Sequence, residues 1–234
     1  MKRPMHAVKA LVAGVRLIRD PNRLGEVFEL ADHLLGAATP ARTKQLIDAI
    51  KATPEGARAL ADKPRVGSFD LAVLGKKEPS TLGREFADHM RRNNLDPSAL
   101  PLLPSRTELD FFRAHLYETH DIFHVVTGFN TDVASELGLQ AFYLTQFPGG
   151  LPPALLAGGL INTMIYAIEE RDVRMRAMVR GWLLGKRVKP FFGVRWSELW
   201  DVPLDDVRRR LGVDIAEVEA MLPKCESDNL AHAA

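Results

Sequence analysis

The stretch Tyr117–Phe147, YETHDIFHVVTGFNTDVASELGLQAFYLTQF, contains the clearest structural signals in this sequence of 234 residues. Apolar residues recur at three- and four-residue intervals on both sides of a short polar segment, which predicts two helices joined by a turn. Gly128 can end the first helix in a left-handed conformation, and Asn130 or Thr131 can cap the second helix. The stretch therefore predicts a helix–turn–helix hairpin.

Four side chains of this hairpin form a candidate metal site. His120, Asp121 and His124 fall in one sector of the first helix, because each residue advances the helix by about 100°. His120 and His124 are neighbours at i and i+4, with Cβ atoms about 5–6 Å apart, which suits two imidazoles on one divalent metal. Glu136 lies six residues after Asn130 and His124 six before it, so the turn returns the carboxylate towards the imidazoles. This donor set suits zinc, manganese or iron(II), and tolerates magnesium.

Helical periodicity also dominates the rest of the chain, whereas alternating β-branched runs are nearly absent. We therefore expect an all-α fold that forms a single domain over residues 1–234, with its core at about 8–214 and a frayed C-terminal tail at about 223–234. Only residues 65–74 have the alternation of a short strand. Proline-containing turns mark the connections. The expected helices cover residues 7–19, 24–36, 41–52, 80–93, 108–127, 132–146, 154–180, 196–201 and 204–211.

The composition is that of an ordinary globular protein. Hydrophobic residues make up 46% of the chain and charged residues 26%, which excludes a disordered chain, a collagen-like fibre and a polytopic membrane protein. Thirty-one basic and thirty acidic residues give a net charge of +1, so we expect no nucleic-acid partner. The single cysteine, Cys225, excludes a disulfide framework and an all-thiolate metal site, and it favours a reducing cytoplasm.

The N-terminal segment predicts an amphipathic helix. Lys9 and Arg16 interrupt its apolar run and no small-residue cleavage site follows, which argues against a secretory signal. We expect this helix to dock on the core, and a membrane-surface anchor is the alternative. The apolar side chains at helical spacing are Val8, Leu11, Val12 and Val15, followed by Ile18 or Arg19.

The least polar window is Leu151–Ile168, LPPALLAGGLINTMIYAI. From Ala154 only about fifteen helical residues remain, about 22 Å at 1.5 Å per residue, which is short of a hydrocarbon core of about 30 Å. We therefore predict a buried helix in which Gly158 and Gly159 permit close approach of another backbone, and no transmembrane span.

A second segment mixes basic and aromatic residues between Arg171 and Trp200. The segment from Arg171 to Arg195 contains eight basic residues and one acidic residue, Asp172. Such a mixture is typical of a protein that lies on an anionic bilayer at headgroup level. The alternative is a solvated charged face over core aromatic residues. The aromatic residues are Trp182, Phe191, Phe192, Trp196 and Trp200.

The hairpin motif resembles that of a known family. HDIFH, then eleven residues, then Glu136 is similar to the HDxxH-x(11)-E motif of the coenzyme Q biosynthesis protein 4 family. The similarity extends over roughly residues 8–214. One departure precedes the motif, where the family usually carries RYRE and this chain has His115-Leu116-Tyr117-Glu118. Further matching segments are Thr53–Gly56, Lys63–Val66, Ser80–Gly83, Asp96-Pro97, Gly181-Trp182, Lys189-Pro190 and Trp196–Trp200 up to Arg208.

The resemblance implies an all-α, homodimeric protein of ubiquinone biosynthesis that works with other proteins of that pathway. It implies a cytoplasmic protein peripherally associated with the inner membrane, with the metal, zinc as first choice, on His120, Asp121, His124 and Glu136. It also implies an isoprenoid lipid ligand. The implied activity is that of a lyase, an oxidative decarboxylase that replaces the C1 carboxylate of a polyprenylated 4-hydroxybenzoate-type precursor by hydroxyl.

Two other functions remain open from the sequence. One is a non-catalytic scaffold that binds a polyprenyl lipid and gathers its partners around a structural metal. The other is an HD-type metal phosphohydrolase, which requires a further upstream histidine and a downstream aspartate, and only His89 and Asp172 are available. We otherwise expect no metal-binding role for the remaining histidines, which are His6, His33, His89, His115 and His232.

Overall fold

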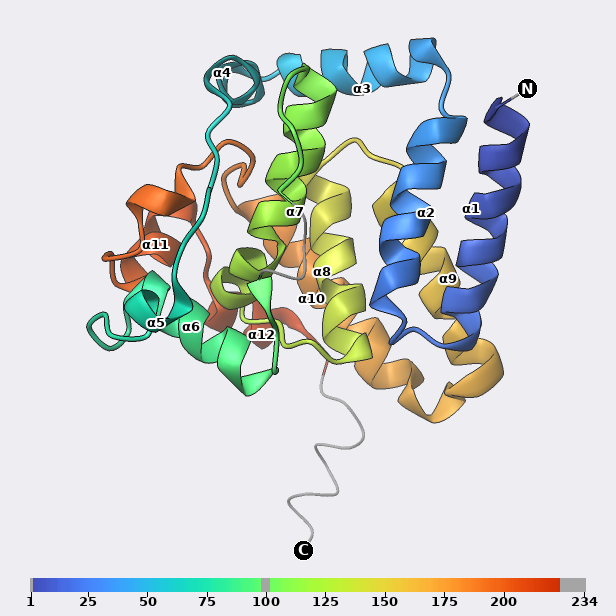
Figure 1. Cartoon of the computed structure of the whole chain (residues 1–234). Coiled ribbons are helices and arrows are strands. Elements are labelled where there is room, and N and C mark those ends of the chain that lie inside the picture. The colour runs from blue at the N-terminus through green and yellow to red at the C-terminus, as the bar shows by residue number, and fades with distance from the viewer. Residues whose placement is uncertain (1, 98–101, 224–234) are drawn as a thin grey trace, which may run out of the picture. The chain divides into compact units, whose positions relative to one another are not determined.

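The computed structural model describes residues 2–97 and 102–223, and within these ranges the chain forms helices and no strand (Figure 1). The all-α prediction is therefore confirmed. Most of the predicted C-terminal tail, with Cys225 and His232, lies outside the described residues.

The chain divides into two compact units, and the expected single domain stays a prediction. Neither unit is one continuous piece of chain. We call them the first and the second unit, and their boundaries cut through α3 (Pro40–Lys51) and α12 (Ile215–Met221). The first unit contains Met1–Leu46, Asp132–Lys186 and Ala216–Ala234, and the second contains Ile47–Thr131 and Arg187–Ile215.

The second unit is built around α7 (Glu108–Thr127), whose bounds match the prediction. Its start is a capping box, in which the Thr107 hydroxyl accepts from the Asp110 N–H and the Asp110 carboxylate accepts from the Thr107 N–H, both at 3.1 Å. Gly128 ends the helix with a φ of 70°, a conformation that favours glycine.

The predicted strand at residues 65–74 is wrong. The Val66 N–H is bonded to the Glu118 carboxylate rather than to a neighbouring strand. The Asp70 side chain accepts from the Ala72 N–H at 2.7 Å and starts the short helix α5 (Leu71–Leu74). A local side-chain cap thus overrides the β-branched pattern. Other elements of the second unit are α4 (Pro54–Asp62), which the sequence analysis missed, α6 (Leu82–Arg92), η3 (Trp196–Glu198) and α11 (Leu204–Leu211).

The aromatic residues after Lys189 belong to the core of the second unit. Phe191 and Trp196 pack edge-on against each other, and both contact Phe123 of α7. Phe192 and Trp200 are also buried. The membrane-facing interpretation of these four residues is therefore wrong, because their side chains are used to fill the core.

The first unit places α1 (Lys2–Arg19) beside α2 (Leu24–Ala37), and α9 (Leu151–Tyr166) packs against both (Figure 1). The prediction of a helix docked on the core is only half right, because the predicted apolar stripe does not make the contact. Val8 and Leu11 are 61% and 68% exposed. The buried face carries small residues, which let the helices approach closely, and the core cluster is Ala10, Ala13, Leu17 and Leu30.

The predicted helix at 154–180 is interrupted. Helix α9 ends at Tyr166, a 3-10 turn follows at Ile168–Glu170, and α10 (Arg171–Arg187) continues the chain. The buried guanidinium of Arg174 explains the break, because it bonds the side chains of Asn162 and Thr163 and so requires α10 to fold back onto α9.

Helix α9 is also less buried than predicted. Only Pro152, Asn162 and Thr163 are buried in it, and its outer face exposes apolar side chains. The close approach at Gly159 is made by a side chain rather than by the predicted backbone, because the atom nearest to a Cβ there would be Leu137 Cδ2 at 2.3 Å. No helix in the described part of the chain is long and apolar enough to cross a membrane. The exposed apolar residues of α9 are Leu160, Ile161, Met164, Ile165 and Tyr166.

Helix α8 (Val133–Gln146) packs closely on α10 within the first unit. A Cβ at Gly181 would overlap the carbonyl oxygen of Gly138, and one at Gly185 would overlap the Thr145 hydroxyl. The Gln146 side chain donates to the Gly185 carbonyl at 2.9 Å. These contacts fix the rotation of α8 and hence the direction of its first-turn residues.

Candidate metal centre

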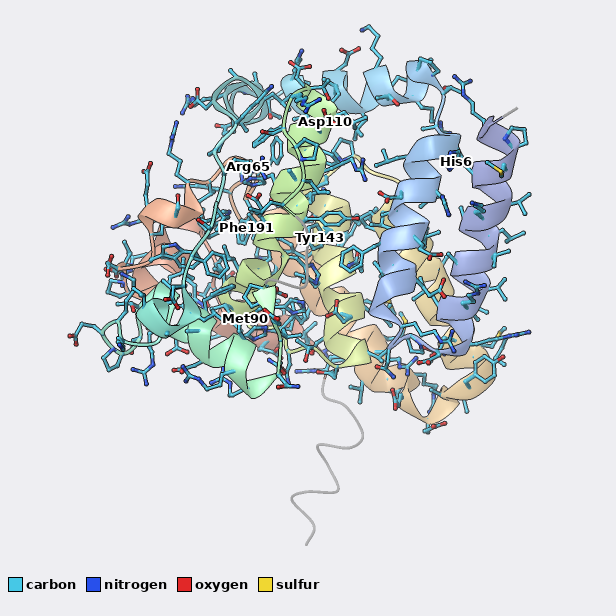
Figure 2. The ribbon with its side chains drawn as sticks, in the orientation of Figure 1. His6, Arg65, Met90, Asp110, Tyr143 and Phe191 are labelled. Carbon is cyan, nitrogen blue, oxygen red and sulfur yellow. The ribbon has the colours of Figure 1, made fainter. Side chains whose placement is uncertain are left out.

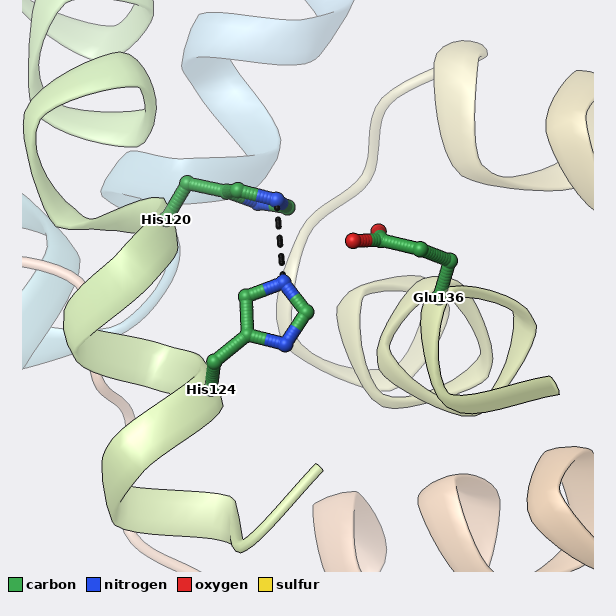
Figure 3. A group of neighbouring side chains, drawn as sticks. All are labelled: His120, His124 and Glu136. Carbon is green, nitrogen blue, oxygen red and sulfur yellow. Dashed lines mark hydrogen bonds between the residues drawn. The ribbon is translucent and has the colours of Figure 1, made fainter. Parts of the chain in front are cut away.

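The predicted histidine pair meets on one face of α7. The Nε2 atoms of His120 and His124 lie 3.2 Å apart (Figure 3). Their rings are nearly perpendicular, at 88°, with centroids 4.7 Å apart. His124 is 1% exposed, and His120 is half-buried. This i,i+4 pair therefore offers two imidazole nitrogens that point to a common place.

Glu136 is carried by the first turn of α8. The N-cap of this helix is Asp132, whose carboxylate accepts from the Ser135 N–H at 3.0 Å, so neither of the predicted caps is used. His120, His124 and Glu136 each offer one ligand atom, and these atoms all lie within 4.8 Å of one another (Figure 3). Among the described residues, three of the four predicted metal ligands therefore come together.

Asp121, the fourth predicted ligand, is not part of this group. It is half-buried on α7, and its charge raises the pKa of His89, against a larger lowering by burial and by His124. The structure thus places Asp121 where its charge acts on His89, a histidine outside the ligand group of the described residues.

His89 is the residue of this region that the sequence analysis left without a metal role. It is 5% exposed on α6, and its ring stacks on that of His124, with centroids 5.7 Å apart and an angle of 22°. Burial, followed by the neighbouring His124, lowers its pKa to about 4. The sequence places His89 within the predicted helix at 80–93. It does not reveal the stacking, because His124 is far away along the chain.

The segment that departs from the family pattern anchors α7 within the second unit. The Glu118 carboxylate accepts from the Arg65 Nε at 2.9 Å and from the Val66 N–H at 3.1 Å. His115 lies 3.3 Å by its Nδ1 from the Pro64 carbonyl and accepts from the Gly193 N–H at its Nε2. Burial lowers the pKa of His115 to about 4. Both residues therefore hold the helix that carries the histidine pair.

The HD-type phosphohydrolase hypothesis finds little support in these contacts. Asp172 has a side chain that is 55% exposed and pairs with Arg171, and the ligand group of the described residues does not include it. His6 (labelled in Figure 2) and His33 approach each other on α1 and α2, with Nδ1 atoms 3.2 Å apart, but no carboxylate of the described residues joins them in a group of three.

The donor set fits a divalent metal. Two imidazoles with one carboxylate are the ligands of many catalytic zinc sites and of non-haem iron(II) centres. Three protein ligands leave coordination positions open, whereas structural zinc sites are closed by four.

The fold and the site thus define an all-α protein with a histidine–histidine–glutamate group on consecutive helices. The family model for the coenzyme Q (ubiquinone) biosynthesis protein Coq4 matches residues 2–217. The chain therefore belongs to the Coq4 family of coenzyme Q biosynthesis proteins, as the motif resemblance predicted.

Named relatives are similar to this chain at moderate identity. A mitochondrial ubiquinone biosynthesis protein COQ4 homolog of Drosophila erecta is 27% identical over 179 residues, 73% of this chain and 64% of the relative. The mitochondrial ubiquinone biosynthesis protein coq-4 of Neurospora crassa is 28% identical over 209 residues, 86% of this chain and 58% of the relative. The chain thus spans less than two thirds of the length of these relatives.

A solved structure has the same fold. The crystal structure of a protein from Nostoc punctiforme, described as a ubiquinone biosynthesis protein, superposes with a TM-score of 0.76 at 28% identity. The match covers 89% of this chain and 98% of that protein.

Proposed function

We propose that His120, His124 and Glu136 hold a divalent metal, and that this centre serves a reaction of ubiquinone biosynthesis. The single observation that carries the proposal is the convergence of three ligand atoms within 4.8 Å. Zinc is the first choice, and iron(II), manganese and magnesium are the alternatives. Asp121 completes the set either as a fourth ligand or by orienting a histidine.

The proposed substrate is a polyprenylated 4-hydroxybenzoate-type precursor, whose C1 carboxylate is replaced by hydroxyl. This conversion releases CO2 and is a two-electron oxidation of the substrate. With dioxygen as the oxidant, one oxygen atom forms the new hydroxyl and the other leaves as water, which takes two electrons and two protons from an external reductant. A bound divalent metal supplies Lewis-acid stabilisation of the negative charge on the reacting oxygens. The names of the relatives support a substrate from ubiquinone biosynthesis, and the three-ligand donor set supports a metal-dependent step.

The chain's own residues then have distinct tasks. The imidazoles of His120 and His124 and the carboxylate of Glu136 bind and fix the metal, while the buried position of His124 excludes water from its side of the centre. Glu118, bonded to Arg65, holds the helix that carries both histidines. Such support matters because a displacement of 1 Å at a reacting centre can cost about a hundredfold in rate.

A second candidate function is a non-catalytic lipid-binding scaffold, and the exposed apolar surface of the first unit favours it. Many large apolar side chains are exposed on α1 and α9, and an exposed apolar surface is a candidate binding site. We propose that they contact the hydrocarbon of an isoprenoid lipid or of the inner membrane, with which the protein would associate peripherally; a second copy of the chain is the alternative. These side chains are Met5, Val8, Leu11, Val12 and Val15 of α1 and Leu160, Ile161, Met164, Ile165 and Tyr166 of α9.

Metal content distinguishes these functions. Purified wild type is compared with Glu136→Ala and with Glu169→Ala, a matched control that removes an exposed carboxylate from the 3-10 turn. We expect about one metal per chain in wild type and control, and a loss in Glu136→Ala. The extracted lipid is identified in parallel, and the conversion of a prenylated hydroxybenzoate is then assayed under air with a chemical reductant present. Metal-free but folded wild type after supplementation would refute the metal centre, and bound metal without turnover would favour the scaffold.

A further inference from the structure

His89 lies against the proposed metal centre although it is not one of the proposed ligands. His124 has two imidazole neighbours: His120 meets it edge-on at 88°, whereas His89 stacks on it at 22°. A ring stacked on a buried ring restricts its rotation, because the interior is close-packed and offers no alternative volume. The plane of His124 is therefore set from two directions, and both contacts lie within the second unit.

The His89 ring is itself held by Asn93 at the end of α6. The Asn93 Nδ2 donates to the His89 carbonyl at 3.0 Å and lies 3.4 Å from the His89 Nδ1. Because a carbonyl oxygen can only accept, this contact fixes the orientation of the Asn93 amide. An N–H donor then faces Nδ1, so the neutral ring carries its proton on Nε2.

The same amide also holds the turn that follows α7. The Asn93 Oδ1 accepts from the Thr131 hydroxyl at 2.9 Å, and Thr131 directly precedes Asp132, the N-cap of α8. One asparagine thus bonds to the histidine that stacks on His124 and to the residue from which the chain continues towards Glu136. The buried Nε2 of His89 has no hydrogen-bond partner among the described residues, so packing against His124 rather than a hydrogen bond fixes that end of the ring.

We propose that His89 is a positioning residue of the metal centre, and that Asn93 and Thr131 lock it in place. This inference rests on the proposed metal site. His89 orients the imidazole of His124 by stacking, and the Asn93–Thr131 hydrogen bond fixes the turn between the two parts of the motif. Residues that orient metal ligands typically change metal affinity by about 10–100-fold when they are removed.

The test is a zinc titration of the purified full chain, with cobalt(II) absorption as a second readout of ligand geometry. His89→Ala should weaken zinc binding about 10–100-fold and change the cobalt spectrum, whereas His89→Phe, which retains a stacked ring, should keep most of the affinity. Thr131→Val should weaken binding without removing any ring. Should His89→Ala fail to fold, the zinc affinity of Thr131→Val decides, and an unchanged affinity would then overturn the proposal.

The matched control is Phe86→Leu. Phe86 is a buried aromatic residue on the same helix as His89, but it packs against Phe69 and Trp200. Its replacement should lower the melting temperature and leave zinc affinity unchanged. Wild-type affinity in folded His89→Ala, or an equal loss in Phe86→Leu, would overturn the positioning role. Failure of the proposed metal site is recognised separately, because the wild type itself would then bind no metal or Glu136→Ala would bind it normally.

Discussion

The stability of this protein should fall steeply below pH 6.5, and His115 should account for a defined part of the fall. Both ring nitrogens of His115 are used in one tautomer, since the Pro64 carbonyl can only accept at Nδ1 and the Gly193 N–H donates to Nε2. A second proton on Nε2 would face an N–H donor in a buried site. Burial accordingly lowers the pKa of His115 from 6.5 to about 4, against smaller raising effects of the Pro64 backbone, Glu118 and the Phe191 backbone.

The magnitude follows from the linkage between proton binding and folding. The folded-state pKa lies below the unfolded one, so the unfolded chain binds more protons between pH 6.5 and 4 and the stability is lost as pH falls through that window. Each pKa unit corresponds to about 1.4 kcal/mol. At pH 5 the unfolded histidine is already protonated and the folded one is not, so the free energy of unfolding should drop by about 2 kcal/mol between pH 7 and pH 5 because of His115 alone.

The assay is urea denaturation at pH 7, 6 and 5 for wild type and His115→Gln. Glutamine does not titrate, so the decrease from pH 7 to pH 5 should be smaller in the variant by about 2 kcal/mol, whatever its stability at pH 7. The equally lowered pKa of His89 contributes to both proteins and cancels in this comparison. Parallel pH dependences of the two proteins would refute the assigned tautomer and the burial argument.

Three further predictions concern the contacts that support the fold. Gly181→Ala should lower stability by about 2 kcal/mol, because its Cβ would overlap the Gly138 carbonyl, and an unchanged melting temperature would contradict the close crossing of α8 and α10. Glu118→Gln should lower the free energy of unfolding, measured by urea denaturation, by about 3 kcal/mol, because it leaves Arg65 without its carboxylate partner. A decrease below about 0.5 kcal/mol would show that this pair contributes no more than a weak surface ion pair. Arg174→Met should cost about 3 kcal/mol and loosen α10 from α9, measured as faster amide hydrogen exchange in α10, and unchanged exchange would contradict its bridging role.

The sequence predicted those elements whose ends are marked by local chemistry. Helix α7 has its observed bounds because Thr107 and Gly128 act as caps within one turn of the helix. The histidine pair was predictable for the same reason, since an i,i+4 spacing brings two side chains together without any other part of the fold. The break after Tyr166 has no local signal, because no proline or glycine stands there and the cause is the distant guanidinium of Arg174.

Helix α1 shows why apolar periodicity alone predicted the wrong side of a helix to be buried. The pattern detected the larger residues, yet the face that packs is lined by Ala10 and Ala13, whose small side chains allow neighbouring helices to approach more closely than Val8 or Leu11 would. A hydrophobic stripe therefore indicates only that something apolar will cover it. In this chain the stripe points outward, so the same residues that suggested a core helix become the argument for a lipid or protein partner of the first unit.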